Sequence, residues 1–446
     1  MYPSRPEPSR GGTRRAKLAG SPRDFVPVTD AAVRAEVDRL AVQVSAARHL
    51  PFRGTLQARA IGRDAADAQV AAALAARITT ADLGAEEQML KRLGLIAGAA
   101  DYAKLWAASA SAAPVATYDP ATQRLLVPDF LPLADQRVPL IHEIAHALAD
   151  RRFDLRAFLA PTPPALVELS GDLTRARLAI VEGDATLATM EVVDPTGAFL
   201  RPTALASLAD RLRAGAGEGR PPWLAALGRF VHVDGLLFVA RVRARQPWSA
   251  VDALWRDPPV SSEQVLHPDK YDSCEAPIAV PESTLPLLPG FEPPRASDVL
   301  GELVIRAWLA TALPPEVAAR AAAGWGGDRA ALYRPTPAAP DGGVPAPVTV
   351  GPPALAWLTV WDDAGEAEDF ARAAAAVAGD GGVQRREEAV ALWFGPSDPA
   401  PQALDAMLES WRAATSKARA HAGGRKPRGP EHLPGGAARG CARGGR

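Results

Sequence analysis

The feature that most constrains this chain is the segment VPLIHEIAHALAD at residues 138–150, where two histidines and a glutamate interrupt an apolar run. The apolar residues predict a mostly buried helix, and Pro139 is tolerated in its first turn because the N–H groups there have no intrahelical partner. His142 and His146 are four residues apart, so they lie on one face of that helix. Buried imidazoles are costly unless they are hydrogen-bonded or bound to a metal. The segment therefore indicates either satisfied core histidines or, in our interpretation, a metal site.

The motif is HExxH, and its geometry suits zinc. Two imidazoles one helical turn apart can bind one tetrahedral ion, so we predict His142 and His146 as Zn²⁺ ligands. Glu143 is rotated by about 100° from His142. It can therefore reach a water at the metal without becoming a ligand, and we predict it as the general base of a metal-assisted hydrolysis.

The third zinc ligand must come from another part of the chain, because a catalytic zinc keeps three protein ligands and an open position for water. We predict Glu182, in the segment LAIVEGDATLA, on a helix over residues 172–190. Gly183 stands beside it, and a glycine inside a helix costs about 1 kcal/mol relative to alanine. We expect this glycine to allow a close approach to the HExxH helix. Glu168 and Asp172 are the alternative ligands.

Two aspartates are candidates for orienting the ligating histidines. Asp150 lies two turns after His142 on the same face, and Asp184 follows the predicted third ligand closely. Either carboxylate can accept the outer N–H of a metal-bound imidazole and fix its tautomer. The alternative is that both are surface carboxylates.

The rest of the chain predicts an α+β fold. A strand at 55–61 and a hairpin of 115–118 with 124–128 precede the HExxH helix, and helices dominate after it. The Pro-rich segment 281–296 marks a boundary. A helix at 298–313, a Gly-rich turn GWGGDR at 324–329, a strand at 355–361, a helix at 364–378 and a strand at 389–394 then follow. We divide the chain into a disordered segment at 1–24, a mainly helical domain with a small antiparallel sheet at 25–290, a small α+β domain at 291–414 and a disordered basic tail at 415–446.

Composition limits the partners. The net charge of −1 gives the chain as a whole no electrostatic reason to bind nucleic acid. Its two cysteines, Cys274 and Cys441, exclude a disulfide framework and a thiolate zinc site. We expect no membrane span and no signal peptide, hence a cytoplasmic location unless the true start lies upstream. Nothing in the sequence indicates an oligomeric state.

These segments resemble a family of uncharacterised bacterial zinc metallopeptidases of the gluzincin type. HExxH followed by EGDA is the most specific part of the resemblance, and Ala149 and Arg152 depart from the family pattern. The matching segments extend over most of residues 30–395 and are TYDPATQRLLV, HEIAHALADRRFDL, LAIVEGDATLA, SSEQVLHPDKY and GWGGDRAALY.

The resemblance implies a zincin-like fold, in which the hairpin and the strand at 55–61 form a small sheet above the active helix. An edge strand of that sheet would bind an extended peptide by strand addition. It also implies a donor for the developing oxyanion from a later loop, for which His267 and Tyr271 are the candidates. We therefore predict a zinc peptidase acting on a peptide or protein substrate. The alternative is a non-catalytic zincin scaffold that binds peptides.

Overall fold

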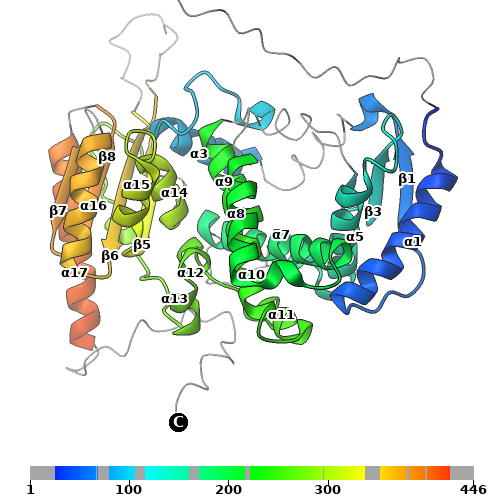
Figure 1. The fold of residues 1–446 in the computed structure, drawn as a ribbon. Coiled ribbons are helices and arrows are strands. Elements are labelled where there is room, and N and C mark those ends of the chain that lie inside the picture. The colour runs from blue at the N-terminus through cyan, green and yellow to red at the C-terminus, as the bar shows by residue number, and fades with distance from the viewer. Residues whose placement is uncertain are drawn as a thin grey trace, which may run out of the picture.

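A computed structural model of the chain describes residues 26–66, 68, 80–105, 116–159, 170–215, 221–294, 296–336, 352–378, 382–396 and 399–421. It is an α+β protein in which a helical part with one small sheet is joined to a part built on a larger sheet (Figure 1). The predicted boundaries at residues 24 and 290 stay predictions: residue 24 lies outside the described residues, and Val280 and Leu288 already pack with the larger sheet. The predicted tail lies mostly outside the described residues, although the last helix runs to His421, past the predicted start of the tail.

The N-terminal part begins with a capped helix and a small sheet. Thr29 caps the first helix, because its side-chain oxygen accepts a hydrogen bond from the N–H of Ala32. The elements are α1 (Asp30–Arg48), β1 (Gln57–Ile61), α3 (Thr80–Arg92), β2 (Thr117–Asp119), β3 (Arg124–Pro128), α5 (Arg137–Phe153), α6 (Leu155–Leu159) and α7 (Gly171–Val193).

The small sheet has the strand order β1-β3-β2, with β2 at one edge. The predicted hairpin and strand are therefore present, and β2 and β3 pack against α5, as expected. The prediction of an antiparallel sheet was wrong in one respect, because β1 runs parallel to β3, with Ala58 opposite Leu125. A parallel neighbour needs a long crossover connection, and more than 60 residues separate the two strands here.

The middle of the chain is helical. It contains η1 (Ala198–Leu200), α8 (Pro202–Gly215), α9 (Pro222–Arg229), η2 (Phe230–Asp234), α10 (Gly235–Arg243), α11 (Trp248–Leu254), α12 (Ser262–Leu266), α13 (Pro268–Asp272) and η3 (Glu282–Thr284). The elements α9, η2 and α10 form one continuous helix with a π-helical turn, η2, in its middle.

That continuous helix, residues 222–243, is long and apolar enough to cross a membrane. However, 67% of its most apolar window is buried inside the structure, and α10 packs along α7. Burial in the core explains why this helix is apolar, so its apolar composition is weak evidence for a membrane span.

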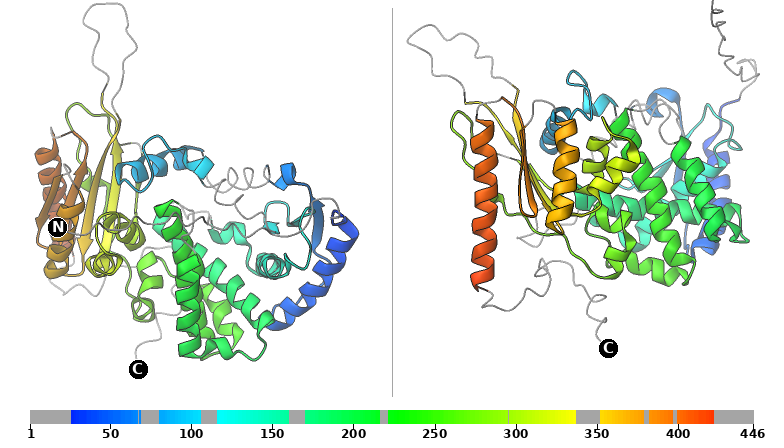
Figure 2. Two further views of the ribbon diagram at one scale, coloured as in Figure 1. Left: turned by 45° about the horizontal axis from the view of Figure 1, so that its top comes forward. Right: turned by 60° about the vertical axis from the view of Figure 1, so that its left-hand side comes forward.

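The C-terminal part is built on a five-stranded sheet of order β4-β5-β6-β8-β7, antiparallel throughout. Helix α17 covers one face, and α16 with α14 and α15 covers the other (Figure 2). The elements are β4 (Ser297–Asp298), α14 (Gly301–Leu309), α15 (Pro315–Ala322), β5 (Trp325–Tyr333), β6 (Ala354–Trp361), α16 (Ala364–Val377), β7 (Gly382–Arg386), β8 (Ala389–Phe394) and α17 (Ala400–His421).

The prediction of a turn at GWGGDR was wrong, because these residues begin the buried strand β5. The glycines serve close packing rather than a change of direction. A Cβ at Gly327 would lie 2.1 Å from the backbone oxygen of Ile278. A segment of backbone thus crosses the strand at a distance that only glycine permits.

Candidate metal centre

Three predicted ligands meet between α5 and α7. Nε2 of His142 lies 3.0 Å from Nε2 of His146 and 3.2 Å from Oε2 of Glu182, and His146 Nε2 lies 3.4 Å from the same oxygen. Two atoms bound to a tetrahedral zinc at bond lengths of about 2.0–2.1 Å are roughly 3.3 Å apart. The donor set and its spacing therefore fit a zinc ion. Without a metal, the three side chains are within hydrogen-bond distance of one another.

The electrostatics of the cluster favour an ionised glutamate. Burial pushes the pKa of Glu182 upward, but the charge of His146 and hydrogen bonds from both histidines outweigh it and hold this pKa well below its ordinary value. The carboxyl group is thus deprotonated beside the charged imidazole, and a bound zinc would take the place of that charge, because histidine binds metal in its neutral form. His142, His146 and Glu182 are all largely buried, with side-chain exposures of 20, 10 and 15%.

Glu143 points to the edge strand of the small sheet. Its Oε2 accepts a hydrogen bond of 2.7 Å from the backbone N–H of Tyr118 in β2. The hydroxyl of Tyr118 in turn donates to Oδ2 of Asp150, at 2.6 Å. Strand β2 is thereby fastened to α5 at two positions, and the carboxylate of Glu143 is held beside the histidines.

The role of Asp150 and Asp184 as acceptors from the ligating histidines stays a prediction, and both carboxylates have other partners. Asp150 receives the hydroxyl of Tyr118 and the N–H of Leu155. Asp184 lies on the other side of α7, where it pairs with the buried guanidinium of Arg48 at 2.6 Å and accepts from the indole N–H of Trp255. Residues 182 and 184 are about 200° apart around the helix. One therefore faces α5 and the other the core.

Gly183 allows a close helix approach, but to a different helix from the one predicted. A Cβ at Gly183 would lie 2.4 Å from the backbone oxygen of Gly235, and a Cβ at Gly235 would lie 2.3 Å from that of Ala179. The two glycines thus bring α7 against α10, not against the HExxH helix.

This close approach places a histidine that the sequence analysis missed. His232, in the π-helical turn η2, has its Nδ1 3.5 Å from Oε2 of Glu182, and its ring centroid is 6.4 Å from that of His142. Half of its side chain is exposed, so it borders the open side of the cluster. π-Helical turns are rare and occur often at functional sites. No spacing rule indicated His232, because its approach depends on how α10 packs on α7.

The predicted oxyanion donors, His267 and Tyr271, have partners outside the histidine cluster. His267 bonds through Nε2 to the buried carboxylate of Glu302, at 3.0 Å, and the hydroxyl of Tyr271 donates to the carbonyl oxygen of Asp257. Tyr271 packs edge-on against Phe238 of α10. Both residues thus have partners in a neighbouring layer.

A second group of acidic residues lies near Lys270. The Nζ atom of Lys270 contacts Oε1 of Glu263 at 2.7 Å, Oε1 of Glu275 at 2.8 Å and Oδ2 of Asp362 at 2.5 Å. Burial raises the pKa of Glu263 to about 9, against the opposing effect of Lys270. Because an ammonium group already neutralises these carboxylates, we assign the group to the contact between α13 and the end of β6 rather than to a metal.

Comparison with known proteins gives one match. Residues 291–417 match a protein family described as a domain of unknown function, DUF8575. The match covers the five-stranded sheet and its helices, which is less than a third of the 446 residues and does not include the histidine cluster. No curated protein and no solved structure matches the chain.

Proposed function

We propose that this chain is a zinc-dependent peptidase, with His142, His146 and Glu182 as the residues that hold the metal. The observation that carries the proposal is the convergence of three ligand atoms within 3.4 Å of one another. They come from two helices, and His142 and Glu182 are 40 residues apart in the sequence. Among the described residues, these three form the one group of potential metal ligands that contains histidine.

Zinc, when bound, would act as a Lewis acid that activates water and polarises a carbonyl group. Glu143 would accept the proton of the attacking water and transfer it to the leaving amine. Its position supports this role, since the N–H of Tyr118 fixes one carboxylate oxygen and leaves the other available.

His232 replaces His267 and Tyr271 as our proposed donor to the developing oxyanion. It lies at the open border of the cluster, and an imidazole N–H there can donate to an oxygen whose negative charge grows during the reaction. The substrate would lie beside β2, the edge strand whose second side has no strand partner in the described structure, and would not bond to the N–H of Tyr118, which Glu143 accepts.

The decisive experiment combines metal analysis with a proteolysis assay on purified protein, using fluorescein-labelled casein. Wild-type protein should bind one zinc ion and cleave casein. Glu143→Gln should keep the zinc and lose hydrolysis, since the missing general base contributes roughly 10²–10⁴-fold. His146→Ala should lose the zinc as well.

Glu36→Gln is a matched control, because Glu36 is partly exposed on α1 and pairs only with Arg39, three residues away. It should behave as wild type. Undiminished cleavage by Glu143→Gln would refute the role of that residue, and wild-type protein without zinc would refute the proposal. Zinc binding without hydrolysis of any peptide would instead support the non-catalytic scaffold.

A further inference from the structure

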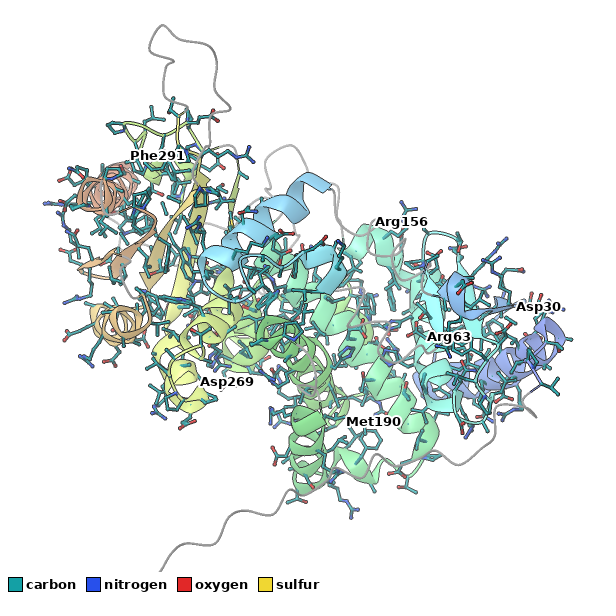
Figure 3. The ribbon with its side chains drawn as sticks, turned by 90° about the horizontal axis from the view of Figure 1, so that it is seen from above. Asp30, Arg63, Arg156, Met190, Asp269 and Phe291 are labelled. Atoms are coloured by element: carbon teal, nitrogen blue, oxygen red, sulfur yellow. The ribbon has the colours of Figure 1, made fainter. Side chains whose placement is uncertain are left out.

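A cleft separate from the histidine cluster lies at the ends of the helices that carry it. It has a volume of about 1160 Å³ and is formed by the last turns of α1, α7 and α10, the first residue of α5 and the loop before α8. Met190, the neighbour of the lining residue Glu191, marks this region (Figure 3). Arg137 precedes His142 by five residues, which is about 7.5 Å along the helix.

The charge of this cleft is positive. Four arginines line it, namely Arg137, Arg201, Arg243 and Arg245, whereas Glu191 is the single acid among the described lining residues. The chain as a whole has a net charge of −1. The cleft is therefore a local concentration of cations on a nearly neutral molecule, and it would attract an anionic ligand.

Two of the arginines are held in place by neighbouring residues. The Nε of Arg243 lies 2.9 Å from Oε1 of Glu191, and its guanidinium lies 5.4 Å above the ring of Trp248. Arg137 donates through Nη2 to the side-chain oxygen of Gln43. Arg243 also donates through Nη2 to Oε2 of Glu191 and through Nη1 to the carbonyl oxygen of Gln246. A guanidinium carries five N–H donors, so Arg137 can bind a carboxylate without losing its contact with Gln43.

Helix dipoles explain only part of this arrangement. Arg243 and Arg245 lie at the C-terminal end of α10, where a cation is favourable in any helix. Arg137, however, is the first residue of α5, and no acidic residue lies in that first turn. A cation at a helix N-terminus is unfavourable. A bound anion beside Arg137 would remove this repulsion.

Exposed apolar residues are next in sequence to residues that line the cleft. Val42, Val138 and Val193 are exposed to 63, 52 and 57%, and each is the chain neighbour of a lining residue. These three are half of the large hydrophobic residues that are exposed in the described structure. A small inorganic anion would leave them in water, whereas a peptide with both carboxylates and apolar side chains would cover them.

We propose that this cleft binds an acidic peptide segment of a partner protein, in which carboxylates alternate with apolar residues. The carboxylates pair with the arginines, and the apolar side chains pack on the valines at the rim. The size of the cleft suits such a segment better than a single phosphate or carboxylate. This site does not depend on the zinc centre, so it stands whether or not the chain is a peptidase.

The test is fluorescence anisotropy with a labelled peptide in which Glu and Leu alternate. The full-length Glu143→Gln variant avoids cleavage of the probe. The peptide should bind, and binding should weaken as salt is raised. A peptide with Gln in place of Glu should bind at least about tenfold more weakly.

The exposed pair Arg201→Glu and Arg245→Glu should weaken binding to a similar extent. Arg320→Glu makes the same change of charge on α15, in the C-terminal part, and should leave binding unchanged. If the double charge reversal does not fold, the single variants Arg201→Gln and Arg245→Gln apply the same test more weakly. Equal binding of the Glu and Gln peptides, no effect of any arginine variant, or binding of pyrophosphate or of anionic lipid vesicles but not of the peptide would overturn the proposal.

Discussion

The contact between Gly183 and Gly235 allows a sharp test of how the third ligand is positioned. Gly183 follows Glu182 directly, and Gly235 begins the helix that follows His232. A methyl group at position 183 would lie 2.4 Å from the oxygen and 2.5 Å from the carbon of the Gly235 carbonyl, whereas ordinary contacts of a Cβ begin near 3.4 Å. The neighbouring atoms belong to the backbone and cannot rotate away. The two helices would have to separate by about 1 Å.

The expected magnitude is the difference between two effects. Alanine in a helix interior is favoured over glycine by about 1 kcal/mol, and overpacking of a close contact typically costs about 1–3 kcal/mol. Because the clash at Gly183 is with rigid backbone, we expect the upper part of this range and a net loss of roughly 1–2 kcal/mol. Separation of α7 from α10 would also move His232, the proposed oxyanion donor, away from Glu182. Casein cleavage should therefore fall as well, whereas zinc content should be kept, because the three proposed ligands lie on α5 and α7.

The assay is urea unfolding of Gly183→Ala, with Gly84→Ala as the matched control. Gly84 lies on the exposed surface of α3, and a Cβ there would meet no atom within 4 Å. The control should gain up to about 1 kcal/mol, because it receives the helix propensity without the clash. If both variants gained stability alike, the close crossing of α7 and α10 would not be a constraint, and our account of the EGDA segment would be wrong.

Two further predictions concern buried polar groups. Tyr118→Phe removes the hydroxyl that Asp150 accepts, so the free energy of unfolding should fall by about 1–3 kcal/mol in urea titrations while zinc content is kept; an unchanged midpoint would contradict this contact. Burial raises the pKa of Asp172 from its ordinary 3.8 to about 7, so the folded protein favours the protonated carboxyl group. The contribution of Asp172 to stability is therefore complete below about pH 4 and is lost as the pH rises through about 7. Asp172→Asn should therefore flatten the fall in stability between about pH 4 and 7, and an identical slope in the wild type and the variant would exclude Asp172 as its source.

The sequence predicted the parts of the structure that depend on local periodicity. The spacing of His142 and His146 is set by the helix itself, and Glu182 was predicted because it lies on a helix that carries an unexpected glycine beside it. The two strands that flank Asp119–Thr122 pair as predicted, because the turn residues between them are typical of a hairpin.

Features that depend on packing between distant segments were missed or misassigned. His232 reaches Glu182 only because two glycines bring α10 against α7, and no local pattern encodes that contact. Asp184 looked like a partner of the site because it is close in sequence, yet it faces Arg48 on the opposite side of the helix. Gly326 and Gly327 read as a turn because glycine is common in turns, whereas here they make room for a crossing backbone segment.

The C-terminal unit matched to the domain of unknown function is joined to the candidate site through buried carboxylates. Asp298 accepts from the N–H of Gly171, the first residue of α7, and Asp328 accepts from the N–H groups of Leu300 and Gly301. A Cβ at Gly301 would lie 1.9 Å from Oδ1 of Asp172.

These contacts fix the start of α7, about 16 Å along the helix from Glu182. A helix fixed at its first turn and crossed closely at Gly183 has little freedom to move its ligand away from the histidines. The C-terminal unit therefore supports the geometry of the candidate metal centre even though it contributes no ligand. The family match to residues 291–417 thus covers the unit that supports the site and not the ligands themselves.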